Sequence, residues 1–255
     1  MYLLTTSQSL YGTALLKAKE ILDYIATSKS SPTLKEISEN VSPSKPTVLK
    51  LLQTLQYCGY VTCDPESKKY FLGTIFLRYA STISLTHTIN LIAKPYLAKL
   101  RDVTQETVNL GIIEHNEVIL LNKLESPNSI KLVSRIGGAM KMYSSAMGKS
   151  ILSEYDEDRL KDYLKKVPLE PVTKNTITSK KELLADLDSV RKNGYALEKG
   201  ENQPEVICVG FSLVKDGRVY GTMSISTPWY RVNKESLAMF IREGKKTQQE
   251  ILNHI

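Results

Sequence analysis

Apolar positions in the first forty residues recur at the spacing of helices. In "ALLKAKEILDYIATS", four of them fall on one side of a helix and predict a buried face: Leu15, Ala18, Leu22 and Ile25. In "SPTLKEISENVS", Leu34 and Ile37 lie three residues apart, and Ser31-Pro32 or Thr33 supplies a helix start. The pattern therefore predicts one long helix followed by a short one.

A third helix is predicted over about residues 45 to 58, in "SPSKPTVLKLLQTLQYCGY". Ser44 is a suitable N-cap, Pro46 falls in the first turn, where its missing N–H costs nothing, and Gly59 ends the helix. At about 100° per residue the apolar side chains share one face, which we expect to be buried: Val48, Leu51, Leu52 and Leu55. The outward face is polar and carries a cation.

The stretch "YVTCDPESKKYFLG" after this helix predicts two strands, residues 60–63 and 69–72, joined by a turn at Asp64-Pro65. A helix, a helix-turn-helix and a hairpin in this order are typical of a winged helix. A recognition helix lies in the major groove of DNA while the wing reaches phosphates, so we expect these DNA-binding residues: Lys45, Thr47, Leu49, Lys50, Gln53, Lys68 and Lys69. The alternative is a plain three-helix domain that contacts protein and leaves its lysines in solvent.

The remaining two thirds of the chain predict an α+β domain. Residues 74–107 have a helical pattern with Pro95 as a possible break, and further helices are predicted at 146–152, 157–165, 180–193 and 234–254. Strands are predicted on both sides of a turn at His115-Asn116, in "SIKLVSRIG", and in "YALEKG", "VICVGFSLV" and "RVYGTMSIS". Lys215-Asp216-Gly217 is a hairpin signal between the last two strands. We expect one twisted antiparallel sheet.

Composition narrows the class of protein. With 255 residues, 42% of them hydrophobic and 24% charged, the chain is long enough for two modest domains. It has no run of about 18 apolar residues and no signal-peptide pattern, so we expect a cytoplasmic protein without a membrane partner. Three cysteines and three histidines offer neither a disulfide framework nor zinc-ligand spacing, so no structural metal is expected.

Charge alone does not identify the partner. A net charge of +7 fits a polyanion, although many basic proteins bind none. Residues 1–75 hold eight lysines and six acidic residues, a net charge of +2. The prediction of DNA binding therefore depends on the order of the elements rather than on the charge.

No catalytic constellation is recognisable in the second half. "MYSSAMGKS" ends in the Gly-Lys-Ser of a phosphate-binding loop, but the glycine that such a loop needs five residues earlier is Tyr143. Ser144 and Ser145 have no evident histidine partner, and the acidic residues of "EKGENQPE" are interpreted as a solvated loop. We expect no catalytic residue and no cofactor. An enzyme that acts on a 2-keto acid is the alternative from a different class.

Several motifs, in this order, resemble those of the IclR family of bacterial transcriptional regulators: "TVLKLLQTLQYCGYV" with "YFLG", then "SSAMGKSIL", "TKNTIT", "VRKNGYALEKGE", "ICVGFSLV" and "SISTPWYRV". The likeness runs from about Ala14 to the last helix. It implies a winged helix-turn-helix in residues 1–75, a linker helix in 76–90 and an effector-binding domain of GAF-like fold in 91–255. It also implies a homodimer or homotetramer.

The resemblance implies an effector site. "SAMGKS" would enter a helix at the rim of a pocket, where free N–H groups and the helix dipole favour a carboxylate, with Lys149 free to face solvent. The implied effector-binding residues are Ser145, Ala146, Met147, Gly148, Glu198, Cys208, Ser224 and Ser226. The serines at 224 and 226 alternate along one strand, so both can face the pocket. This chain departs from the family pattern at three positions: the family often has a shorter acid at 198, usually a glycine at 205 and often a glycine at 227.

These expectations combine into one function. The chain would bind a double-stranded DNA operator through its first domain and change its affinity when a small carboxylate metabolite, a 2-keto acid or a sugar-acid derivative, binds the second. The resemblance favours a repressor. A sensor whose winged helix contacts protein is a further alternative, and a DNA mobility shift with and without metabolites separates it from a regulator and from an enzyme.

Overall fold

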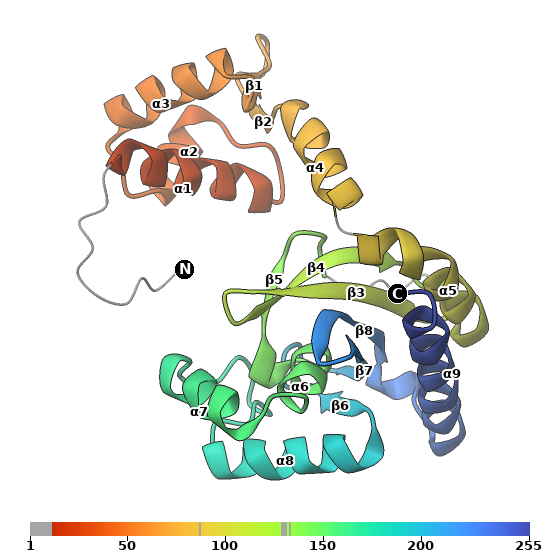
Figure 1. The fold of residues 1–255 in the computed structure, drawn as a ribbon. Helices are drawn as coiled ribbons and strands as arrows, with labels where there is room; N and C mark the ends of the chain where they lie inside the picture. Colours follow the sequence, from red (N-terminus) through yellow and green to blue (C-terminus); the bar gives the residue numbers. More distant parts are fainter. Residues whose placement is uncertain (1–11, 87, 129–131, 133) are drawn as a thin grey trace. The chain divides into compact units, whose positions relative to one another are not determined.

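The chain divides into two compact units, one ending at Thr86 and one from residue 87 onward. The computed structural model describes residues 12–86, 88–128, 132 and 134–255. Figure 1 shows a helical first unit with a small hairpin, and a second unit built on a larger sheet. The predicted linker, residues 76–90, spans most of the last helix of the first unit and the beginning of the first helix of the second.

The first unit has the predicted order of elements. These are α1 (Thr13–Thr27), α2 (Leu34–Asn40), α3 (Lys45–Tyr57), β1 (Val61–Cys63), β2 (Tyr70–Leu72) and α4 (Ile75–Thr86). Strands β1 and β2 pair antiparallel and form the wing. Thr33 and Glu36 make a capping box at the start of α2. At the end of α3, Gly59 adopts a φ of 76°, and the N–H of Tyr60 donates to the carbonyl of Leu55, so the helix stops where the glycine predicts.

A single apolar cluster holds the first unit together: Ile21, Ile25, Ile37, Val48, Leu52, Leu55, Val61 and Tyr70. The predicted buried face of α3 is confirmed, with Leu51 half-buried at its edge. The prediction for α1 is wrong at Leu15, whose side chain is 76% exposed. The first turn of α1 extends beyond the core, so the buried face begins at Ala18 and includes Ile21.

The second unit is an α+β domain, as predicted. Its elements are α5 (Thr88–Thr104), β3 (Thr107–Glu114), β4 (Glu117–Leu124), β5 (Ala139–Lys141), η1 (Met142–Ser144), α6 (Ala146–Leu152), α7 (Glu157–Lys166), α8 (Lys180–Asn193), β6 (Ala196–Lys199), β7 (Val206–Lys215), β8 (Arg218–Pro228), η2 (Trp229–Arg231) and α9 (Lys234–Leu252). The sheet is antiparallel with strand order β5-β4-β3-β8-β7-β6.

One expectation for this unit needs correction. Pro95 does not break the helix, because α5 runs through it to Thr104. The strand expected in residues 129–137 lies in part outside the described residues, at 129–131 and 133; the described remainder of that range contains no strand, and β5 begins at Ala139. The two predicted hairpin turns are confirmed, since His115, Asn116, Asp216 and Gly217 all have positive φ angles between their strands.

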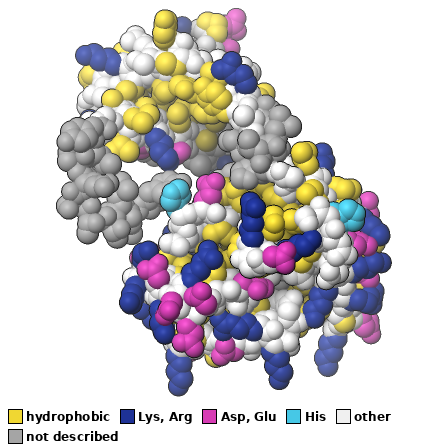
Figure 2. Space-filling view, viewed as in Figure 1, with side chains coloured by type: hydrophobic (Ala, Val, Ile, Leu, Met, Phe, Trp, Pro, Cys, Tyr) yellow, Lys and Arg dark blue, Asp and Glu magenta, His cyan; other side chains and the backbone are white. Residues whose placement is uncertain are grey.

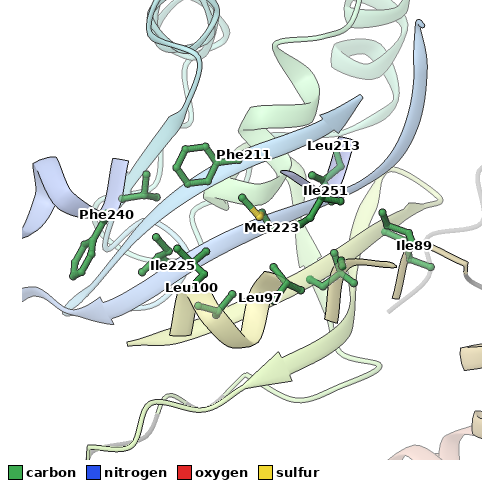
Figure 3. Close-up of a cluster of buried hydrophobic side chains, with 14 residues drawn as sticks. Ile89, Leu97, Leu100, Phe211, Leu213, Met223, Ile225, Phe240 and Ile251 are labelled. Carbon is green, nitrogen blue, oxygen red and sulfur yellow. The ribbon is translucent and has the colours of Figure 1, made fainter. Parts of the chain in front are cut away.

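Each face of the sheet packs against different helices. Helices α5 and α9 lie side by side over one face (Figure 1) and bury the alternate apolar side chains of β3, β7 and β8. Figure 3 shows this cluster, in which Phe211, Met223 and Ile225 from the sheet meet Leu97 and Leu100 of α5 and Phe240 and Ile251 of α9. Helix α6 packs on the opposite face, with α7 and α8 beyond it.

The residues between these apolar positions face α6, and strand register aligns them in two rows. One row crosses four strands as Asn109, Ser224, Gly210 and Ala196; the next contains Ser226, Cys208 and Glu198. Gly210 allows a close approach, because a Cβ there would lie 2.3 Å from the carbonyl oxygen of Ala146 and 2.8 Å from the nitrogen of Met147. The first turn of α6 therefore lies directly on the sheet, beside the two polar rows.

Candidate effector pocket and nucleic-acid interface

A cavity of about 40 Å³ lies between the start of α6 and the two polar rows of the sheet. Its lining contains seven of the eight residues proposed for the effector site: Ser145, Ala146, Met147, Glu198, Cys208, Ser224 and Ser226. These residues come from four segments separated by up to 81 positions in the sequence. The cavity shares four lining residues, Ser134, Met140, Asn202 and Gln203, with a wider cleft of about 390 Å³.

Gly148 does not line this cavity, and its N–H is not free. It donates to the side-chain oxygen of Ser145, the N-cap of α6, at 3.1 Å. Gly148 has a packing role instead, because a Cβ there would lie 2.2 Å from the Cα of Met142. Among the described residues, the N–H groups of Ala146 and Met147 have no hydrogen-bond acceptor. The helix start therefore offers two free N–H groups rather than three.

Glu198 is a buried carboxyl group in the pocket wall, with 1% of its surface exposed. One of its oxygens accepts hydrogen bonds from the N–H groups of Glu201 and Asn202, and Cys208 also bonds to this carboxyl group. Burial nevertheless raises the pKa of Glu198 to about 7, since removal from water disfavours the charged form. The same burial, together with the neighbouring Glu198, raises the pKa of the Cys208 thiol.

Lys149 does not face solvent, contrary to expectation; it is fully buried. Its ammonium group lies 2.8 Å from Glu201 and 3.0 Å from Asp186, and donates to the carbonyl of Leu197 at 3.0 Å. Glu201 is also buried, so the solvated-loop interpretation of "EKGENQPE" is wrong for Glu198 and Glu201, although Glu205 is exposed. Burial raises the pKa of Glu201, and the charge of Lys149 opposes that shift.

The "TKNTIT" motif fixes the segment that carries these acids. The hydroxyl of Thr173 donates to the carbonyl of Gly200 at 2.6 Å, and that of Thr176 donates to the carbonyl of Glu201 at 2.7 Å. The loop ends at Glu205, which adopts a left-handed φ of 62°. This conformation explains why a glycine is usual at that position in the family pattern.

Part of the lining was not predicted from the sequence: Asn109, Leu132, Ser134, Met140, Asn202, Gln203 and Val206. Asn109 could have been found, because an asparagine within the apolar strand "TVNLGII" is unfavourable unless its side chain has a specific partner. The others lie on loops or at strand ends, where no periodicity marks the side that a residue faces.

The proposed DNA-binding residues lie on α3 and the wing. Lys45, Leu49, Lys50 and Gln53 are exposed along α3, and Thr47 is half-buried. Lys68 and Lys69 are exposed at the wing turn, where one carboxylate oxygen of Asp64 accepts the N–H groups of Glu66 and Ser67. These seven side chains therefore remain accessible to a ligand of the first unit.

Figure 2 shows cations and anions interspersed over the visible face of the second unit, and a broad area of hydrophobic side chains on the first. Exposed apolar side chains of the first unit include Leu15, Leu16, Leu49, Tyr57, Phe71, Leu72 and Leu77. No helix within the described ranges is long and apolar enough to cross a membrane.

Comparisons with known proteins agree with both units. A model of the IclR helix-turn-helix domain matches residues 14–65, and a model of the C-terminal part of the bacterial transcriptional regulator IclR matches residues 82–253. The HTH-type transcriptional regulator KdgR of Escherichia coli is 34% identical over 207 residues, covering 81% of this chain and 79% of KdgR. The DNA-binding transcriptional repressor YiaJ of the same species is 31% identical over 246 residues, covering 95% of this chain and 87% of YiaJ.

A solved structure extends the agreement to the fold. The crystal structure of Thermotoga maritima IclR has a TM-score of 0.80 and 33% sequence identity, covering 95% of this chain and 98% of that one. A helix-turn-helix unit joined to an effector-binding domain defines a transcriptional regulator rather than an enzyme. The chain belongs to the IclR family of bacterial transcriptional regulators.

The buried lysine gives the first testable prediction. Lys149→Met would leave two acidic groups without their cation, so we expect the free energy of unfolding to fall by about 3 to 5 kcal/mol. Lys166→Met is the matched control, because Lys166 pairs with Asp162 on the exposed surface of α7, and we expect a loss below about 1 kcal/mol. Urea denaturation measures both, and equal losses would contradict a structural role for the buried cation.

Proposed function

We propose that this protein represses transcription by binding a DNA operator through α3 and the wing, and that a small carboxylate metabolite in the α6 pocket changes its operator affinity. The effector class is a 2-keto acid or a sugar-acid derivative. The observation that carries this proposal is the convergence on one cavity of seven residues that the resemblance to the family implied as effector-binding. Repression is supported by the relative YiaJ, which is named as a repressor and matches 95% of this chain.

The start of α6 supports a carboxylate in the pocket. The free N–H groups of Ala146 and Met147 and the positive end of the helix favour an anion by about 0.3 to 1 kcal/mol at exposed sites and more when partly buried. Hydrogen bonds to a charged acceptor add about 1.5 to 3 kcal/mol. Ser224 and Ser226 lie in the same cavity and offer hydroxyl groups to the remaining oxygens of such a ligand.

Glu198 and the cavity volume restrict the effector further. A second carboxylate beside Glu198 would be repelled by its ionised form, so a monoacid fits better than a dicarboxylic acid. The inner cavity of about 40 Å³ has room for only a few atoms, and the wider cleft beside it can take the rest of a longer molecule. A short acid or one end of a sugar acid meets both conditions.

Glu198 predicts a pH dependence of effector binding. Its pKa of about 7 lies above the ordinary value of 4.5, so the group becomes neutral, and stops repelling a bound carboxylate, as the pH falls through 7. We expect the affinity for pyruvate to rise by about tenfold from pH 8 to pH 6, the limit set by uptake of one proton near pH 7. Calorimetric titration at both values measures it.

Two variants test the cause of that dependence. Glu198→Gln cannot ionise and should bind pyruvate equally at pH 6 and pH 8, whereas Glu205→Gln, at an exposed position outside the cavity, should retain the wild-type dependence.

Ser224→Ala should weaken binding of pyruvate, glyoxylate and 2-keto-3-deoxygluconate. Binding of a neutral or aromatic ligand alone, indifferent to Ser224→Ala, would show that the carboxylate assignment is wrong.

The DNA-binding surface is tested with a charge deletion. Lys50 is exposed on α3, so Lys50→Ala should weaken operator binding and reduce the slope of log K against log salt by about one unit. Lys181→Ala, an exposed lysine at the start of α8, is the control and should change neither quantity. Mobility shifts with and without candidate acids test the whole proposal, and an unchanged salt slope in Lys50→Ala would remove Lys50 from the interface.

We infer that the protein is at least a homodimer, because paired recognition helices read a pseudo-palindromic operator at half-sites about one helical turn apart. Leu15 and Leu16 support this, since they are 76% and 48% exposed at the start of α1. Apolar side chains of the preceding segment, at 3, 4, 10 and 11, lie outside the described residues. Light scattering should give twice the chain mass or more at micromolar concentration, and a monomer would contradict the inference.

A further inference from the structure

Asn109 is a buried polar residue of the pocket floor, and one of its two side-chain polar atoms has no hydrogen-bond partner. It belongs to β3, is 4% exposed, and lines the cavity beside Ser224 and Ser226. Its Nδ2 donates to the hydroxyl oxygen of Ser224 at 3.3 Å and to that of Ser226 at 3.1 Å. Its Oδ1 is buried and has no hydrogen-bond partner. A buried acceptor without a donor is costly, so such an atom in a cavity points to a ligand.

The hydrogen bonds around Asn109 determine which way its amide faces. Ser224 and Ser226 lie 3.3 Å apart at their hydroxyl oxygens, Ser226 bonds to Cys208, and Cys208 bonds to Glu198. Each hydroxyl or thiol has one proton to donate. In a chain of hydrogen bonds that ends at the Glu198 carboxylate, Ser224 donates to Ser226, Ser226 to Cys208 and Cys208 to Glu198. Neither serine then has a proton left to donate to Asn109. The serine oxygens are then acceptors for Nδ2, and Oδ1 must face away from them.

None of the described side chains that line the cavity donates to that oxygen, the amides of Asn202 and Gln203 included. The hydroxyl of Ser145 donates to the carbonyl of Lys141 and accepts the N–H of Gly148. Glu198 accepts backbone N–H groups on one oxygen, and the described lining contains no lysine or arginine. A molecule that fills the cavity can supply the missing donor.

We propose that Asn109 is a specificity-determining residue of the pocket and that it selects a hydroxylated acid, whose hydroxyl group donates to Oδ1. The proposal depends on the proposed function, because it takes the cavity to be the effector site. It narrows the effector class: an acid with only keto oxygens has acceptors where Asn109 requires a donor. An acid carrying hydroxyl groups satisfies Oδ1.

The test compares ligands that differ in hydroxyl groups. Full-length protein is titrated calorimetrically with lactate and glycerate against propionate and pyruvate, and with gluconate against hexanoate. In the wild type we expect at least one hydroxylated acid to bind about tenfold or more tightly than its counterpart without hydroxyls, because the counterpart leaves a buried acceptor unpaired. Equal affinity within every pair would overturn the proposal.

Two substitutions assign the preference to Asn109. Asn109→Leu has no acceptor and should reduce the preference to about twofold or less, while Asn109→Asp keeps an acceptor and should retain the preference even though its charge weakens all acids. Unchanged thermal melting and operator affinity in the absence of ligand establish that each variant is folded. If acids bind but Asn109→Leu keeps the wild-type preference, the role of Asn109 is wrong and the proposed function stands. If no acid binds the wild type at millimolar concentration, both are wrong.

Discussion

The pocket depends on the close approach of the first turn of α6 to the backbone of β7 at Gly210. A Cβ at that position would lie 2.3 Å from a backbone oxygen of the helix, so any larger residue would separate helix and sheet. Gly148 acts in the same way on the other side of α6, where the helix packs against Met142. Two glycines thus bring the free N–H groups of Ala146 and Met147 to the polar rows of the sheet.

The charged groups near the pocket fall into a buried ion-pair cluster and one carboxyl group in the cavity wall. Lys149 is paired with Glu201 and Asp186 behind α6, which leaves Glu198 as the ionisable carboxyl group in the cavity wall. Its pKa of about 7 follows from burial, and its position at the end of a chain through Cys208 and Ser226 orients the amide of Asn109. The protonation state of Glu198 is therefore linked to the orientation of the Asn109 amide in the pocket floor.

Most of the fold follows from patterns that a single sequence displays. Capping residues, turn residues and the spacing of apolar side chains have local causes, which explains why α3 ends at Gly59 and why His115-Asn116 and Asp216-Gly217 form hairpin turns. Apart from the break expected at Pro95, the predictions that were wrong depended on an element's neighbours. Leu15 has the right spacing for the core, but its side chain is 76% exposed, and none of the described residues of the first unit buries it.

By itself the sequence determined the two-unit organisation, the winged helix-turn-helix and the antiparallel α+β domain, and its resemblance to a family indicated seven of the residues that line the cavity. Only the tertiary structure decided that Lys149 is buried, that Gly148 packs rather than binds, and that Asn109 belongs to the pocket. The physical reason is the pairing of strands distant in the sequence. Register places Asn109 beside Ser224, 115 residues later, and no local pattern encodes which residues meet across such a separation.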